Sequence, residues 1–290
     1  MNPDNRSDIM SDNIPDMLSL SAFRLKASAR NALRGNYGKA VLAMLAASAI
    51  SFGSMLIVSI AEAMFVIAHL VFNEIQNGLT IDEVSLLLSD PSYVNGYMGG
   101  YNAINYVLSA ILSIFTSVLN IGLYLFCLNL ACGRPFRVTD IFHGFRHRFG
   151  RSLSLTTVAV LVGQLYSLPY SFLSNLIEQE AWTAVPSAMP ILLIGAVFYV
   201  PLSLGLSQMY MLALDFPSLS AGEVIKMSFR IMRGHKLHLF RVQLSFLPLM
   251  LLSFFTFGIG DIFLAPYMNV TYCFFFLNLM QLRKTTPTTY

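Results

Sequence analysis

Residues 33–60, LRGNYGKAVLAMLAASAISFGSMLIVSI, indicate how this chain folds. The stretch opens with Arg34 and Gly35, and after Lys39 it contains only apolar and small residues. A hydrocarbon core about 30 Å thick needs about 20 apolar residues in a helix that rises about 1.5 Å per residue. The run of residues 40–60 has this length, and its apolar character continues to residue 72. It predicts a membrane-spanning helix that begins directly after a basic residue.

The rest of the chain has the same character. Of its 290 residues 56% are hydrophobic and 11% are charged, whereas soluble domains have about 25% charged residues. Further apolar runs of membrane-spanning length cover residues 104–130, 153–173, 189–214, 242–257 and 262–282. We therefore predict an all-α integral membrane protein with six transmembrane helices.

The basic residues predict the orientation of these helices. Lysine and arginine accumulate in short loops on the cytoplasmic side of a membrane. All 18 basic residues of this chain lie before the first run, between the second and third, between the fourth and fifth, or after the sixth. The opposite loops carry only acidic charges: Glu74, Asp82, Glu83, Asp90, Glu178, Glu180 and Asp261. This distribution predicts that both termini are cytoplasmic.

The basic segments also share a pattern, which predicts three pseudo-repeats of a cytoplasmic amphipathic helix followed by a transmembrane hairpin. Each segment offers one polar and one apolar face, then a glycine (Gly35, Gly150 or Gly234), then a basic residue at the start of the next span (Lys39, Arg151 or Arg241). The third copy adds the capping-box residues Ser220 and Glu223. A further capped helix is expected in the first outer loop, from Thr80 to residue 89.

Several motifs resemble one known family. They are LALDFPSLSAGEVIKMSFRIMRGHKLHLF at residues 212–240, ARNALRGNYGKAV at residues 29–41 and DIFHGFRHRFGRSL at residues 140–153. The chain resembles, over residues 23–282, the bacterial membrane-protein family numbered 975 among domains of unknown function. The resemblance implies a polytopic protein of the bacterial cytoplasmic membrane and brings no catalytic residues. We expect a mobile acidic tail at residues 1–19, one six-helix domain at residues 20–284, and a C-terminal tail at residues 285–290.

The basic residues at the span entrances suit the phosphate groups of anionic lipids, each contributing about 1 kcal/mol near a negatively charged leaflet. Setting the topology of the chain is the simpler explanation of the same residues, and both can hold. Nucleic acid is not an expected partner, because the basic residues are divided among short helices that also face the bilayer. The candidate headgroup or interfacial residues are Lys26, Arg30, Arg34, Lys39, Arg146, Arg148, Arg151, Lys226, Arg230, Arg233, Lys236 and Arg241.

Histidines are the other candidates for chemistry at this end. His143 and His147 are four residues apart, and His235 and His238 are three apart, so a folded hairpin could join them in a metal site. No acidic or cysteine ligand stands at matching spacing, and ordinary interfacial histidines explain both pairs. No metal or cofactor is therefore expected.

Within the spans, neutral polar residues and prolines are the only candidates for a transport path. Gln164, Ser203 and Gln208 are expected at membrane depth, and Pro201 and Pro248 can break the helices that carry them. The sequence contains no HExxH, GxSxG or Walker motif, so catalysis is not expected. We predict a role in membrane organisation or in binding a protein partner in the membrane. The alternative is a small-solute transporter or channel.

Overall fold

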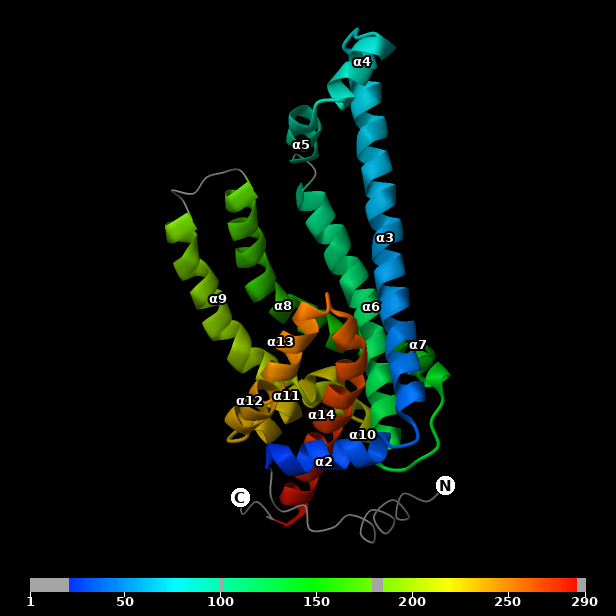
Figure 1. Ribbon diagram of the computed structural model, residues 1–290, viewed down its shortest axis with the longest axis vertical. Helices are drawn as coiled ribbons and strands as arrows, with labels where there is room; N and C mark the ends of the chain where they lie inside the picture. The colour runs from blue at the N-terminus through cyan, green and yellow to red at the C-terminus, as the bar shows by residue number, and fades with distance from the viewer. Residues whose placement is uncertain (1–20, 100–101, 179–184, 286–290) are drawn as a thin grey trace.

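The structure is a computed structural model that describes residues 21–99, 102–178 and 185–285. The predicted tail of residues 1–19, and residues 286–290 of the predicted C-terminal tail, lie outside the described residues. In the described ranges all regular structure is helical (Figure 1). The elements are α2 (Ala22–Leu33), α3 (Tyr37–Gln76), α4 (Ile81–Leu88), α5 (Pro91–Gly99), α6 (Asn102–Ala131), η1 (Val138–Phe142), α7 (His143–Arg146), α8 (Phe149–Glu178), α9 (Val185–Leu206), α10 (Met209–Asp215), α11 (Ala221–Met232), α12 (Lys236–Leu244), α13 (Leu247–Phe255) and α14 (Ile259–Thr285).

Within the described residues, six helical stretches are long and apolar enough to cross a membrane. Each overlaps one of the six predicted runs, so the predicted spans are confirmed. The protein is an all-α, multi-pass integral membrane protein. The stretches are Tyr37–Gln76, Val107–Ala131, Phe149–Ser171, Met189–Asp215, Lys236–Phe255 and Ile259–Leu282.

Two of the spans are interrupted. In the fourth span α9 and α10 are separated at residues 207–208, and in the fifth span α12 and α13 are separated at residues 245–246. Pro248 follows the second interruption in the first turn of α13, where the missing N–H of proline costs little. Pro201 lies inside α9, well before the first interruption. Only Pro248 therefore stands directly beside a break.

The spans pair as hairpins, α3 with α6, α8 with α9 and α13 with α14 (Figure 1). In one view α3 with α6 and α8 with α9 extend farthest, and the shorter hairpin of α13 and α14 reaches only part of the way. The buried core lies at the opposite end, where Phe126, Met209, Phe246 and Phe275 belong to one apolar cluster. Away from this core large apolar side chains point outward, as Phe254 does at 79% exposure, which fits a lipid-facing surface.

Two amphipathic helices, α2 and α11, repeat the same local structure. Each has 12 residues, follows a serine whose side chain accepts a hydrogen bond from the first turn, and ends two residues before a glycine of positive φ. Ser220 and Glu223 form the predicted capping box, and so do Thr80 and Glu83 at the start of α4. The buried positions also correspond in register: Leu25, Ala29 and Leu33 in α2, and Val224, Ser228 and Met232 in α11.

The corresponding segment between the second and third spans is built differently. It consists of the 3-10 helix η1 and the single turn α7, and the residue of positive φ before α8 is Arg148, at 49°. The prediction that Gly150 ends this segment is therefore wrong, because α8 has already begun at Phe149. The predicted equivalence of Arg241 with Lys39 and Arg151 is also wrong. Lys39 and Arg151 are the third residues of their helices, whereas Arg241 is the sixth residue of α12.

These three short segments pack in a consistent way. α2 packs against α14, η1 and α7 pack against α6, and α11 packs against α9 and α10. The segments before the second and third hairpins thus pack on the second span of the preceding hairpin. α2, which comes before the first hairpin, packs on the second span of the third. In Figure 1 α2 (blue) crosses α14 (red) at the end opposite α4.

The glycines that end α2 and α11 need their left-handed backbone. Gly35 has φ 78° and Gly234 has φ 88°, and a Cβ at either would meet no atom within 4 Å. Substitution with alanine therefore imposes only the cost of the left-handed conformation, about 1–2 kcal/mol. We expect Gly234→Ala to lower the thermal unfolding midpoint in detergent. Gly222→Ala, inside α11 and equally free of contacts, should leave the midpoint unchanged or raise it. Equal effects of the two substitutions would contradict this explanation.

Candidate functional site at the basic end

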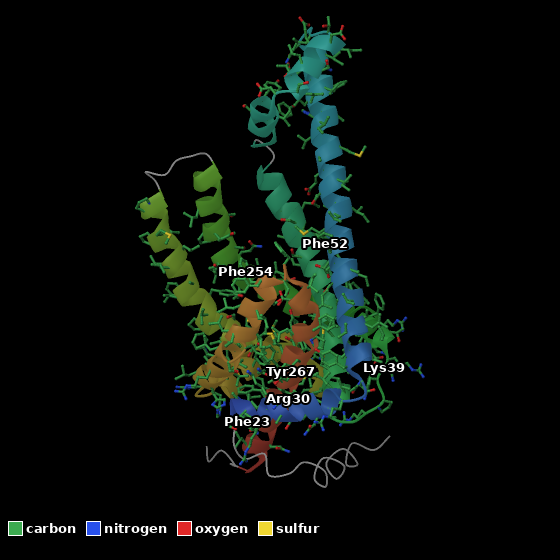
Figure 2. The ribbon with its side chains drawn as sticks, viewed as in Figure 1. Phe23, Arg30, Lys39, Phe52, Phe254 and Tyr267 are labelled. Carbon is green, nitrogen blue, oxygen red and sulfur yellow. The ribbon has the colours of Figure 1, made fainter. Side chains whose placement is uncertain are left out.

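The predicted interfacial residues gather at the end of the bundle that α2 crosses. Figure 2 shows Arg30 and Lys39 there, far from Phe52 on α3 and Phe254 on α13. Their side chains fall into two groups. Those of Lys26, Arg151 and Lys236 are partly buried and bind backbone carbonyls. The exposed ones are Arg30, Arg34, Lys39, Arg146, Arg148, Lys226, Arg230, Arg233 and Arg241.

Lys26 joins α2 to the interruption of the fifth span. Its ammonium group donates to the carbonyl of Ser245 at 2.7 Å and lies 3.9 Å from the centre of the Phe246 ring. Partial burial, and then the nearby charge of Arg30, lower the pKa of this ammonium. A break in a helix leaves carbonyls without an intrahelical partner, and a lysine is a suitable donor to them. Lys26 therefore has a structural role, because it links α2 to the break in the fifth span.

Lys236 has a similar structural contact. It begins α12, and its ammonium group donates to the carbonyl of Pro201 in α9 at 3.1 Å, with the Phe229 ring centre 5.3 Å away. This bond joins the third hairpin to the second. Each of these two lysines thus uses one of its three ammonium donors on a backbone carbonyl of another element.

Arg151 completes the end of α10. Its guanidinium donates to the carbonyls of Ala213, Phe216 and Pro217 at 3.1, 3.0 and 2.9 Å. Arg148 also donates to Pro217, through its own guanidinium. These carbonyls belong to the last turn of α10 and the loop after it, where no intrahelical donors follow. The two arginines therefore hold the α10 end against the start of α8.

Beside this junction lies a pocket of about 500 Å³, which we call the basic pocket. One wall holds cationic and titratable side chains, and the other is apolar and comes from α6 and α10. The lining residues include Ile121, Leu125, His143, Arg146, His147, Arg148, Arg151, Ser152, Leu155, Ala213, Leu214 and Pro217. No acidic residue is among them. The pocket thus combines positive charge with an apolar wall, a combination that suits an amphiphilic anion.

The first residue of α7 and the residue that follows this helix are stacked histidines in this pocket. The ring centres of His143 and His147 are 4.5 Å apart, with an angle of 14° between the ring planes. The other predicted pair lies elsewhere: His238 stacks on Phe275 of α14, and His235 precedes α12. In the part of the chain that the structure describes, no three His, Cys, Asp or Glu side chains form a group that could hold a metal ion.

The histidine stack gives a pH-dependent contribution to stability. Burial, and then the neighbouring His147, lower the pKa of His143, and Asp140 opposes this only in part. Below its ordinary pKa of about 6.5, the unfolded chain then binds more protons than the folded protein. The contribution of His143 is therefore present above about pH 6.5 and is lost as the pH falls through the lowered pKa.

We expect the unfolding midpoint of wild-type protein to fall between about pH 7 and pH 5, and to fall less in His143→Gln. His147→Gln, which removes only the neighbouring ring, should show an intermediate slope. Thermal unfolding in detergent at a series of pH values measures both. Identical slopes for wild type and His143→Gln would show that His143 does not contribute.

The predicted transport-path residues do not share a described cavity. Gln164 accepts a hydrogen bond from Ser167 in α8, Ser203 donates to the carbonyl of Val200 in α9, and Gln208 is buried at the break before α10. Pro201 and Pro248 are exposed. None of the five lines the basic pocket or the other cavities described in the structure.

Sequence reasoning missed the second wall of the basic pocket. Ala213, Leu214 and Pro217 carry no side-chain chemistry, and only the fold brings their backbone to Arg148 and Arg151. It also missed a hydroxyl-lined cleft between α3 and α6, described below. The helical spacing of Ser113, Ser117 and Asn120 is the signal that could have revealed this cleft.

A family model described as "Protein of unknown function (DUF975)" matches residues 20–283, nearly the whole chain. The chain belongs to this family. The match confirms the resemblance expected from the motifs at residues 29–41, 140–153 and 212–240. No curated protein and no solved structure matches the chain. The family description assigns no role, so the function has to be inferred from the geometry.

Proposed function

We propose that this protein is a non-catalytic organiser of the bacterial cytoplasmic membrane that binds anionic lipid headgroups at its basic end. That end, with both termini, faces the cytoplasm in this proposal. The support is the asymmetry of charge: the basic residues gather where α2, α7 and α11 lie, while Asp82, Glu83 and Asp90 lie at the far tip beyond α3. Such a distribution is typical of a cytoplasmic basic end.

The basic pocket is the observation that carries the proposal. Arg148 and Arg151 are held in place by backbone carbonyls, so the positive wall is pre-organised. Arg146 is exposed at the same wall. A phosphate group beside these guanidinium groups accepts charge-assisted hydrogen bonds. Leu155 and Leu214 face the same space and suit the glycerol and acyl portions of a lipid.

The surrounding surface supports the same function. Arg30, Arg34, Arg230 and Arg233 are exposed on or next to the amphipathic helices α2 and α11. Interfacial helices with such cationic faces bind anionic membrane surfaces. The same surface is available to a protein partner in the membrane. We propose no nucleic-acid partner and no cofactor.

Lipid titration tests this proposal. Purified protein in detergent is mixed with phosphatidylglycerol or with phosphatidylcholine of the same acyl chains. We expect phosphatidylglycerol alone to raise the thermal unfolding midpoint in a saturable way, because a ligand that binds only the folded state stabilises it. Equal shifts with both lipids would contradict headgroup recognition.

A second candidate function is passage of a small solute. The observation that favours it is the polar cleft between α3 and α6, rather than the α9 and α13 helices that carry Pro201 and Pro248.

A further inference from the structure

A cleft of about 440 Å³ lies between α3 and α6. Its polar lining comes from both helices: Ser48 and Ser51 from α3, and Ser109, Ser113, Thr116, Ser117 and Asn120 from α6. No Asp, Glu, Lys, Arg or His lines it. Figure 2 labels Phe52, another lining residue, partway along α3 and well separated from Lys39.

The cleft lies at membrane depth. Ser51 is about 18 Å along the helix axis from Lys39, for a rise of about 1.5 Å per residue. If Lys39 marks the edge of a hydrocarbon core about 30 Å thick, Ser51 lies near its middle. Hydroxyl and amide groups at this depth are costly unless they find hydrogen-bond partners.

Several of these groups have no hydrogen-bond partner among the described residues. Thr116 donates back to the carbonyls of Leu112 and Ser113 at 3.0 and 3.3 Å. In the described residues, the side chains of Ser48, Ser113 and Asn120 form no hydrogen bond and are exposed in the cleft.

The fold itself does not require the hydroxyls. The residues of α2 align one for one with those of α11. The alignment continues from α2 into α3 and from α11 into α12 and α13, where Ala47 and Phe246 are buried at matching positions. In this alignment Ser48 corresponds to Leu247 and Ser51 to Met250. The third hairpin is thus built with apolar side chains where the first has serines. The two serines of α3 therefore belong to the cleft and not to the shared framework.

We infer that this cleft is a water-filled binding site for a small, uncharged, hydroxyl-bearing solute. Serine hydroxyls both donate and accept hydrogen bonds, as a polyol does. The absence of charged lining residues disfavours ions. At about 30 Å³ per water, the volume corresponds to about 15 waters, which is ample for a molecule such as glycerol. A solute site here extends the second candidate function and is independent of lipid binding in the basic pocket.

Cysteine labelling in proteoliposomes tests the site. Ser51→Cys and Ser113→Cys are compared with Ile57→Cys and Ile111→Cys, exposed apolar positions on the same two helices that do not line the cleft. Wild-type protein gives the background from Cys127, Cys132 and Cys273. Because thiolates form in water and not in hydrocarbon, a charged, membrane-impermeant methanethiosulfonate should label the cleft cysteines about tenfold faster or more.

Glycerol is the solute probe. At about twice its dissociation constant it should slow labelling at Ser113→Cys about threefold, and the slowing should saturate. Ser85→Cys, exposed on α4, should react at an unchanged rate. Arg146→Gln should leave all these rates unchanged, so failure of the lipid proposal would be seen separately.

Three results would overturn the inference. Equal labelling at cleft and apolar positions would mean that lipid fills the cleft. Disulfide-linked dimers of Ser113→Cys under mild oxidation would assign the face to a second copy of the chain. Glycerol that protects no position, or that slows Ser85→Cys equally, would remove the solute.

Discussion

Alanine in place of Gly122 is expected to destabilise the protein by about 3 kcal/mol or more, because the substitution forces two backbones apart. A Cβ on Gly122 in α6 would lie 2.0 Å from the carbonyl oxygen of Ile141 and 2.5 Å from that of Asp140. Both carbonyls belong to η1, which packs closely on α6. Backbone atoms cannot move aside as a flexible side chain can, so η1 must leave its place.

The displacement should also reach the basic pocket, since η1 leads directly into α7 with His143 and Arg146. The thermal unfolding midpoint of Gly122→Ala in detergent, and its recovery as a monodisperse peak, measure the effect. Gly163→Ala is the matched control, because Gly163 also lies inside a spanning helix and a Cβ there meets no atom within 4 Å. If both variants unfold at the same temperature, the contact between η1 and α6 is not tight in solution.

The double variant Arg146→Gln, Arg148→Gln should bind phosphatidylglycerol about thirtyfold more weakly than wild type. Each basic residue contributes about 1 kcal/mol near an anionic headgroup, and about 2 kcal/mol corresponds to about thirtyfold in Kd. Both residues line the pocket, and Arg151 remains to hold the end of α10. The measurement is the lipid concentration that gives half of the maximal thermal shift.

The control for this pair is Arg34→Gln, Arg241→Gln. Both residues are exposed at the same end of the bundle, and neither lines the pocket. Loss of the same total charge should change the affinity less than about threefold, because exposed charges in water interact weakly. Equal losses from the two double variants would show a diffuse cationic surface and would exclude a specific pocket.

The sequence was sufficient for the spans and their helices. Long apolar runs and the capping boxes of Ser220 and Thr80 are local signals, because their physical causes act within one helix. Arg148 shows where local signals fail. Gly150 is the glycine expected to end this segment, but the residue with a left-handed backbone is Arg148, whose guanidinium donates to the carbonyl of Pro217 about 70 residues away. A long-range contact thus overrides the local preference for glycine.

The residue types at the candidate site could be predicted from the sequence, but the groups that each residue binds could not. The residues from Arg146 to Arg151 mark the basic end from sequence alone. Lys26 binds a carbonyl at the interruption of the fifth span, Arg151 binds carbonyls at the end of α10, and Lys236 binds a carbonyl inside α9. The hydropathy pattern reveals none of these contacts. The cleft could not be predicted from its hydroxyl groups, because isolated serines are common in membrane helices. They indicate a polar cleft only once the fold shows which two helices face each other.

The contact between α2 and α14 also determines the order in which the protein can mature. α2 ends at Leu33, and α14 begins at Ile259, so more than two hundred residues must be made between them. At about 5–20 residues per second, α2 waits for tens of seconds after its own synthesis before its partner exists. During that interval its apolar face, with Leu25, Ala29 and Leu33, lacks the α14 surface on which it packs, and the membrane surface is available to cover it. The amphipathic character of α2 thus allows this helix to lie on the membrane surface until α14 has been made.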